Sequence, residues 1–226
     1  IAAYHLMVDG EKMSKSTGNF HTGDALLDEH GASADQIRLH LASLALAERG
    51  ADFDFARFAE RNAFLAGPLN AAFEKPIAAC HSKFGGTVPA GRLDDKTWAG
   101  TVRIVTRYLK AMDRGDYPNL LNEIENYARS INSLFARFRP HDDRHDAGER
   151  ADALYSCFHV LKNLLIMLHP FAPHTCERLR ETLRLGEDVY RVDELGSAIP
   201  AGHAIGAQQT YRSEERRVGK ECATGC

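Results

Sequence analysis

The sequence contains few cysteines, and none of them is spaced as a metal-binding or redox pair. Five of the 226 residues are cysteines, and two of these fall within residues 212–226. The other three, Cys80, Cys157 and Cys176, form no Cys-x-x-Cys pair, which argues against a zinc knuckle and a disulfide framework. Isolated thiols are typical of a reducing compartment, so the sequence predicts a cytoplasmic location.

The chain also lacks a strong charge of one sign and a long hydrophobic run. It has 28 Lys and Arg against 31 Asp and Glu, a net charge of −3, which argues against a general nucleic-acid-coating protein with clustered cations. No apolar run reaches the roughly 18 residues of a membrane span. The nearest, residues 159–169, is interrupted by Lys162 and Asn163, so we expect no membrane partner.

The two ends of the sequence are unusual. The first residue is Ile1 and not methionine, and residues Arg212–Cys222 resemble the translation of a short-read sequencing adapter. We therefore interpret 212–226 as an artefact, exclude it from fold reasoning, and interpret the chain as an internal piece of a longer protein.

Amphipathic patterns predict that most of the chain is helical. Apolar spacing and capping residues predict helices over 33–47, from 53 to beyond 73, and over 94–112, 117–138, 147–169 and 173–183. Ser33 and Gln36 have capping-box spacing, Asp54 or a neighbour should cap the second helix, and Asp94 or Asp95 should open the third. Pro68 and Pro76 should bend or break the second helix. A short strand over 4–8 precedes these helices. The predicted fold class is mostly α, with a strand and loop followed by a helix bundle.

One short basic segment carries the clearest chemical signal. Lys12, Met13, Ser14, Lys15 and Ser16 form a loop that is closed by Gly18-Asn19. Two ammonium groups on long stems, interleaved with hydroxyl and backbone donors, are suited to bind a polyphosphate.

This segment, called the KMSKS loop (Lys12–Ser16) from here on, resembles the second signature of class I aminoacyl-tRNA synthetases. The similarity covers most of Ile1–Leu183 and is greatest to the methionyl type, although only the loop is specific. The resemblance implies Lys15 as the main catalytic contact to the ATP triphosphate, with Lys12 assisting. Ser14 and Ser16 would orient the loop, and Met13 would pack against the domain.

The resemblance also implies partners and a domain organisation. ATP with Mg²⁺ is the implied substrate, with tRNA and an amino acid as partners, and no metal site is expected in this chain. The family has a nucleotide-binding half before the loop, which also holds the amino-acid pocket, so the chain alone should be inactive. We divide it into the end of a catalytic domain (1–48), a helical tRNA-binding domain (49–190) and a poorly ordered tail (191–226).

In the methionyl family, the anticodon is read by an Asn, an Arg four residues later, and a Trp after a proline. The nearest matches are Asn70, which has Glu74 four residues later, and His141, which follows Pro140. Asn70 and His141 are therefore the candidate tRNA-contacting residues. The only tryptophan, Trp98, is expected in the core.

Two groups of side chains invite a metal interpretation that we do not favour. His174 and Cys176 lack a second ligand pair, and residues 141–146, rich in His and Asp, are more typical of a solvated loop.

Two alternatives to a methionyl-type enzyme remain open. One is another class I synthetase, such as the leucyl type. The other is a non-catalytic, synthetase-derived protein that binds RNA or a partner, which the replacements Glu74 and His141 would suit.

Overall fold

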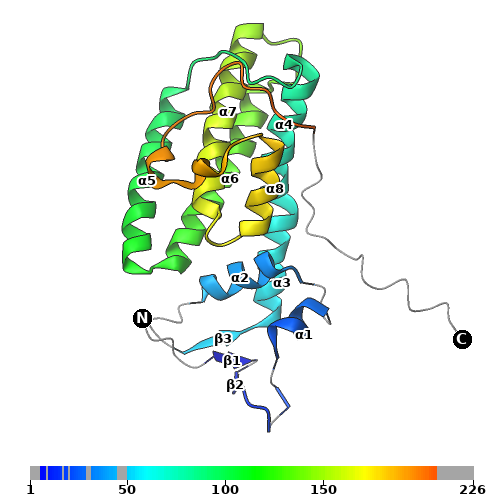
Figure 1. Cartoon of the computed structure of the whole chain (residues 1–226), viewed down its shortest axis with the longest axis vertical. Coiled ribbons are helices and arrows are strands. Elements are labelled where there is room, and N and C mark those ends of the chain that lie inside the picture. The colour runs from blue at the N-terminus through cyan, green and yellow to red at the C-terminus, as the bar shows by residue number, and fades with distance from the viewer. Residues whose placement is uncertain are drawn as a thin grey trace, which may run out of the picture.

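The computed structural model describes residues 6–8, 10–16, 18–19, 21–28, 32–44 and 50–207, with the backbone alone at 65 and 66. A small group of strands and short helices lies at one end of a long helix bundle (Figure 1). The expected start of the first strand at Tyr4, the expected end of the first long helix at Ala47, and the segment 212–226 lie outside the described residues.

The small end holds a three-stranded sheet of order β2-β1-β3. Its strands are β1 (Leu6–Val8), β2 (Glu11–Lys12) and β3 (Ala51–Phe53). β1 and β2 form an antiparallel hairpin, whereas β1 pairs in parallel with β3. The sequence did not predict β3, because a three-residue strand shows no alternation and is stabilised by pairing with a strand more than 40 residues away.

Short helices cover this sheet, and their capping residues are those that the sequence indicates. They are α1 (Gly23–Asp28), α2 (Ala34–Ser43) and α3 (Phe55–Phe64). The capping box of α2 is confirmed, since Ser33 Oγ accepts from Gln36 N at 3.2 Å and Gln36 Oε1 accepts from Ser33 N at 2.6 Å. Asp54 Oδ1 caps α3 by accepting from the Ala56 and Arg57 amides at 2.8 and 3.1 Å, so the helix begins two residues after Phe53.

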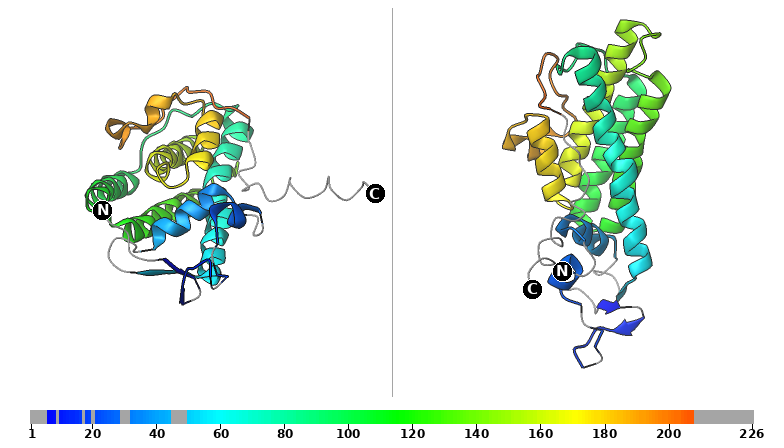
Figure 2. Two further views of the ribbon diagram at one scale, coloured as in Figure 1. Left: turned by 60° about the horizontal axis from the view of Figure 1, so that its bottom comes forward. Right: turned by 90° about the vertical axis from the view of Figure 1, so that its right-hand side faces the viewer.

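The two prolines of the next helical segment have different effects. A π-helical turn, η1 (Leu65–Leu69), contains Pro68, and α4 (Asn70–Phe84) continues directly from it with Pro76 inside. Figure 2 shows α3, η1 and α4 as one long rod. Proline lacks the backbone N–H, so the turn that contains it makes one helical hydrogen bond fewer. The Pro68 carbonyl also accepts from Asn132 Nδ2 of the neighbouring helix at 2.9 Å. Pro68 therefore lies in a local change of helical register, Pro76 lies within a regular α-helix, and neither breaks the rod.

Four further helices complete the bundle. They are α5 (Asp95–Arg114), α6 (Tyr117–Phe138), α7 (Ala147–Leu168) and α8 (Pro173–Thr182). α7 lies at the centre, and fully buried side chains such as Leu154, Leu161 and Leu165 place it in the bundle core. By length and composition α7 could span a membrane, but 83% of that apolar stretch is buried inside the protein. Its apolarity is therefore explained by packing.

The segment after α8 does not match the expected poorly ordered tail as far as residue 207. It contains two short 3-10 helices, η2 (Glu187–Tyr190) and η3 (Val192–Glu194). Lys162 Nζ donates to Glu194 Oε2 at 2.6 Å, Asn163 Oδ1 accepts from Gly196 N at 2.6 Å, and Ile199 is buried. Lys162 and Asn163, the polar residues that interrupt the apolar run of α7, thus bind this segment to the bundle.

Candidate functional site

The KMSKS loop extends from the β1–β2 hairpin. Gly10 has a φ of +81°, which favours glycine, and its N–H donates to Asp52 Oδ2 at 2.9 Å. Met7 pairs with Lys12 in the hairpin register. The first lysine of the loop therefore starts from a strand end that is fastened to β3.

Asn19 closes the loop from its other end. Its Oδ1 accepts from Ser14 N at 2.8 Å and its Nδ2 donates to Lys12 O at 3.2 Å. Within the loop, the hydroxyl oxygens of Ser14 and Ser16 lie 2.8 Å apart in a hydrogen bond. Gly18, with φ +76°, provides the turn that brings Asn19 back to the loop.

The loop separates its charged and apolar side chains. Lys12, Lys15 and Ser16 are exposed, while Met13 packs against the N-terminal cluster, defined here as Val8, Leu26, Ala32, Phe53 and Phe58. The structure therefore packs Met13 as an apolar anchor, as expected, and leaves the side chains of Lys12 and Lys15 exposed. Such an arrangement can bind a polyanion.

The two candidate tRNA-contacting residues differ in exposure. Asn70 begins α4 and is only 7% exposed, so its side chain faces neighbouring groups of the protein. His141 is exposed, and its ring stacks on Phe135 with 5.1 Å between centroids and 4° between planes. Of the two, only His141 presents a side chain that an RNA base can reach directly.

The prediction that Trp98 is a core residue is wrong. Its side chain is 47% exposed on α5, and its ring centroid lies 5.9 Å from that of His159 on α7. The inward face of α5 is taken instead by smaller or less bulky groups, such as Thr97, Thr101 and Ile104.

The acidic loop between α6 and α7 uses its carboxylates within the protein. Asp142 pairs with Arg144, and Asp146 Oδ1 caps α7 by accepting from Gly148 N at 2.8 Å. Asp143 bridges two helices, since its carboxylate lies 2.6 Å from Lys83 Nζ of α4 and 2.5 Å from Arg150 Nη1 of α7. Asp143 therefore acts as a structural clamp, and the paired arginine holds the pKa of Asp142 well below its usual range.

His174 and Cys176 are not arranged as a ligand pair. His174 is exposed, whereas Cys176 is fully buried in the bundle core and burial raises the pKa of its thiol. Among the described residues, no three His, Cys, Asp or Glu side chains are grouped so that they could hold a metal ion.

Sequence reasoning missed the contact that joins α2 to the bundle. The Asp35 carboxylate is 3% exposed and accepts from the backbone N–H groups of Thr175 at 2.6 Å and His174 at 3.3 Å. These amides open α8, whose own N-cap residue, Ala172, has no capping side chain. In addition, Arg38 Nη2 donates to Pro170 O at 2.8 Å. In the sequence Asp35 resembles an ordinary first-turn acid, so no signal pointed to this role.

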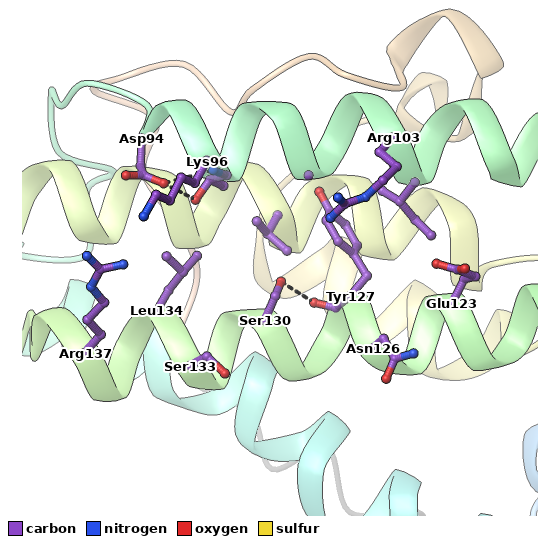
Figure 3. A pocket seen from close by; sticks show the side chains of 14 residues that line it. Asp94, Lys96, Arg103, Glu123, Asn126, Tyr127, Ser130, Ser133, Leu134 and Arg137 are labelled. Atoms are coloured by element: carbon purple, nitrogen blue, oxygen red, sulfur yellow. Dashed lines mark hydrogen bonds between the residues drawn. The ribbon is translucent and has the colours of Figure 1, made fainter.

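A second feature that the sequence did not reveal is a groove between α5 and α6 (Figure 3). It has a volume of about 330 Å³. Three cations reach it, Lys96 and Arg103 from α5 and Arg137 from α6, and all three are exposed. The sequence shows the helical spacing of these residues, but it does not show that α5 and α6 lie side by side.

Two buried histidines remain neutral at physiological pH. Burial, with a further contribution from nearby Arg61, lowers the pKa of His40 to about 4, and burial lowers that of His159 to about 4 as well. His40 lies edge-on against Phe53 and Phe58, with ring centroids 4.6 and 5.3 Å away. It therefore behaves as an apolar packing element between α2 and the N-terminal cluster.

Comparison with known proteins agrees with this architecture. The family described as "Anticodon-binding domain of tRNA ligase" matches residues 96–198. The chain is 22% identical over 204 residues to methionine--tRNA ligase 1 of Alkaliphilus oremlandii, covering 89% of this chain and 37% of that protein. It is 25% identical over 222 residues to the methionine--tRNA ligase of Bacillus cereus, covering 95% of this chain and 40% of that protein. The chain thus spans about two-fifths of the length of these relatives.

Solved structures show the same fold. Mycobacterium tuberculosis methionyl-tRNA synthetase in complex with methionyl-adenylate superposes with a TM-score of 0.75 at 19% identity, covering 92% of this chain and 43% of that one. A second structure of that protein bound by methionyl-adenylate gives a TM-score of 0.79 at 18% identity, covering 91% of this chain and 42% of that one. Residues 96–198 therefore match the anticodon-binding domain of tRNA ligases, within a chain that is similar to methionine--tRNA ligases over most of its length.

Proposed function

We propose that this chain supplies the KMSKS loop and the tRNA-binding helices of an ATP-dependent methionine--tRNA ligase that acts in the cytoplasm. The observation that carries the proposal is the combination of two exposed lysines on a closed hairpin loop with an anticodon-binding helical domain in one chain.

The loop geometry supports a role for Lys15 and Lys12 at the ATP phosphates. Amino-acid activation transfers AMP to the carboxylate and releases pyrophosphate, so negative charge accumulates on the leaving group in the transition state. Ammonium groups at that position stabilise the transition state more than ground-state ATP, which raises the rate. Mg²⁺ enters this reaction as the counter-ion of ATP.

The internal hydrogen bonds of the KMSKS loop support closure of the whole loop over the nucleotide as one unit. Asn19 holds the backbone at both Lys12 and Ser14, while Met13 anchors the loop to the N-terminal cluster. A loop with a fixed shape can swing over the nucleotide and back with little reordering of its own residues.

The geometry and exposure of the His141 ring support a role in tRNA recognition, by stacking on a base. One face of its ring lies on Phe135, so the ring is already oriented, and the side chain is exposed. An aromatic or imidazole ring held in this way can stack on an unpaired anticodon base. Asn70 is buried, and its predicted contact to RNA would need a local rearrangement of α4.

The tRNA-binding part can be tested directly on the whole chain. We expect tighter binding to a labelled RNA stem–loop with the methionine anticodon CAU than to the same stem–loop with a changed anticodon. His141→Ala should weaken binding about tenfold, because loss of one stacked base costs about 1–3 kcal/mol. His145→Ala, in the same loop, is the matched control. Equal binding of both stem–loops would contradict methionine-specific anticodon recognition.

The catalytic part needs two measurements. The chain alone should show no ATP–pyrophosphate exchange with any of the twenty amino acids. In enzymes of the family, the amino-acid pocket lies in the half of the protein that precedes the loop. In the intact protein, methionine should support exchange, and Lys15→Ala should lower its rate at least a hundredfold. Methionine-dependent exchange by the chain alone would show that the pocket lies within it.

The same measurement separates the alternatives. Exchange of the intact protein with leucine or another amino acid would indicate a sister enzyme. No exchange with any amino acid, together with RNA binding by the chain, would favour the non-catalytic relative, which the acidic Glu74 and the replacement by His141 suit.

A further inference from the structure

The groove between α5 and α6 has the form of a shallow anion site. Residues 96, 100, 103 and 107 lie on one face of α5, because they are spaced by four, three and four residues. The facing side of α6 contributes mostly small or polar side chains. The groove is lined by Asp94, Lys96, Thr97, Gly100, Arg103, Ile104, Glu123, Asn126, Tyr127, Ser130, Ser133, Leu134, Arg137 and Val160.

The acidic residues of the groove are already engaged. Asp94 Oδ2 caps α5 by accepting from Thr97 N at 2.9 Å. Glu123 Oε1 lies 2.5 Å from Arg107 Nη1, at the end of the groove that is farther from Asp94 in Figure 3. Within the described part of the chain both carboxylates therefore have partners.

The three remaining cations are not neutralised by described carboxylates. Lys96 and Arg103 make no ion pair to any carboxylate of the described residues, and Arg137 lies over the ring of Phe138 at 4.8 Å. Figure 3 shows the side chains of Lys96 and Arg137 at one end of the groove and that of Arg103 farther along. Lys96 and Arg103 are seven residues apart, about 10 Å along the helix axis. The positive charge is thus spread along the groove and is not concentrated at one place.

The floor of the groove leaves room for a chain to lie in it. The hydroxyl groups of Ser130 and Ser133 donate to backbone carbonyls of their own helix, Tyr127 O at 2.6 Å and Arg129 O at 3.1 Å. Their side chains are therefore held against α6. The exposed amide of Asn126 adds a neutral donor at the Arg103 end of the groove.

We propose that the α5–α6 groove binds the phosphodiester backbone of an RNA strand through Lys96, Arg103 and Arg137. An elongated set of cations that make no ion pair with described carboxylates, above small polar side chains, matches a linear polyanion better than a compact one. Arg137 lies four residues before His141, so the groove continues the surface to which we assign anticodon stacking. The inference rests on the proposed tRNA-binding function and adds a sequence-independent contact to it.

The test compares two triple variants of the whole chain that lose the same charge. The groove variant is Lys96→Gln, Arg103→Gln and Arg137→Gln. The control is Arg57→Gln, Arg114→Gln and Arg191→Gln, which replaces three exposed arginines outside the groove. Binding of the CAU stem–loop is measured from 50 to 300 mM salt, a range over which the Debye length falls from above about 10 Å to below about 8 Å. Urea midpoints confirm that both variants fold.

The groove variant should bind at least tenfold more weakly at low salt than the wild-type chain. Its plot of log affinity against log salt should be less steep by about two, because each lost phosphate contact removes about 0.7 from the slope for a single strand. The control variant should keep most of the wild-type affinity and slope, and a changed anticodon should leave the groove effect intact.

The outcomes separate the inference from the function on which it rests. A wild-type chain that binds no RNA would overturn both. A wild-type chain that binds RNA while both variants lose affinity equally would overturn the groove alone, since binding would then follow net charge. Preferential binding of a polyglutamate peptide over RNA, lost in the groove variant, would assign the groove to an acidic protein segment instead.

Discussion

The helical bundle and the N-terminal part of the chain bury their apolar residues on very different scales. The bundle core is continuous from α4 through α8 and includes fully buried side chains on several helices. The N-terminal cluster consists of Val8, Leu26, Ala32, Phe53 and Phe58, with Met13 of the KMSKS loop packed at its edge. Because local stability follows the amount of buried apolar contact, we expect the part that carries the loop to open at a lower free energy than the bundle.

The junction between the two regions combines apolar packing with specific polar contacts, since Leu39 of α2 and Phe64 of α3 belong to the bundle core. Asp35 caps α8 from α2, and Arg38 bonds the Pro170 carbonyl nearby. Hydrogen bonds of this kind fix orientation more than they add stability. The part that carries the loop is thus held in a defined position on the helical bundle.

The largest effect should come from the bundle core. Leu161→Ala should lower the free energy of unfolding by about 3–4 kcal/mol, since Leu161 is fully buried and its removal leaves a cavity. Urea unfolding followed by far-UV circular dichroism measures this loss. Phe53→Ala is the counterpart in the N-terminal cluster, and it should leave the midpoint of the main helical transition nearly unchanged. An equal shift for both variants would show that the two regions unfold as one cooperative unit.

Acidification should weaken both regions through their buried histidines. His40 and His159 have pKa values near 4 in the folded protein, against about 6.5 when unfolded. Above pH 6.5 both states are neutral and the histidines contribute nothing to the pH dependence. Between pH 6.5 and 4 the unfolded state binds the proton first, so stability falls as pH decreases, by up to about 3 kcal/mol for each histidine.

His159→Leu separates this effect from the titration of the carboxylates. Neither ring nitrogen of His159 has a hydrogen-bond partner among the described residues, so an apolar side chain of similar size should be tolerated. Unfolding midpoints of the variant should fall less between pH 6.5 and 4 than those of the wild-type chain. An identical pH profile would mean that His159 is already protonated, or exposed to water, in the folded state.

The junction should show a smaller loss. Asp35→Ala removes the acceptor for the first amides of α8 and should cost about 1 kcal/mol, the usual value of an N-cap. Hydrogen exchange at the Thr175 amide should accelerate more than exchange elsewhere in the bundle. Asp95→Ala, a first-turn acid of α5 that is exposed, is the control and should cost a few tenths of a kcal/mol. Equal exchange rates at Thr175 in both variants would contradict the cap.

The sequence predicted local features well because they depend on neighbouring residues. The ends of α6 agree with the predicted 117–138, and the capping roles of Ser33, Asp54 and Asp94 are those that short-range spacing indicates. In the loop, the packing of Met13 follows from its being the one apolar residue of a basic segment.

Features that depend on distant partners were missed. β3 is a strand because β1 lies beside it, and Asp35 is buried because α8 begins in front of it. Trp98 was placed in the core by residue type alone, although the outward face of α5 carries it. The segment after residue 191 was expected to be poorly ordered. Nothing in its own sequence shows that Lys162 of α7 is buried and binds Glu194.

The smallest effect on stability, and the one that most sharpens the contrast, should come from Asn19→Ala. Asn19 holds the KMSKS loop at Ser14 N and Lys12 O but contributes little apolar burial. The free energy of unfolding, measured in urea, should therefore change by less than about 0.5 kcal/mol. The loop itself should open more often, because two of its closing hydrogen bonds are lost. Trypsin cleavage after Lys12 and Lys15, followed by mass spectrometry, should therefore be several-fold faster than in Asn122→Ala, a substitution of an exposed asparagine on α6. Unchanged cleavage would mean that the packing of Met13 alone holds the loop, and the N-terminal cluster would then control its closure.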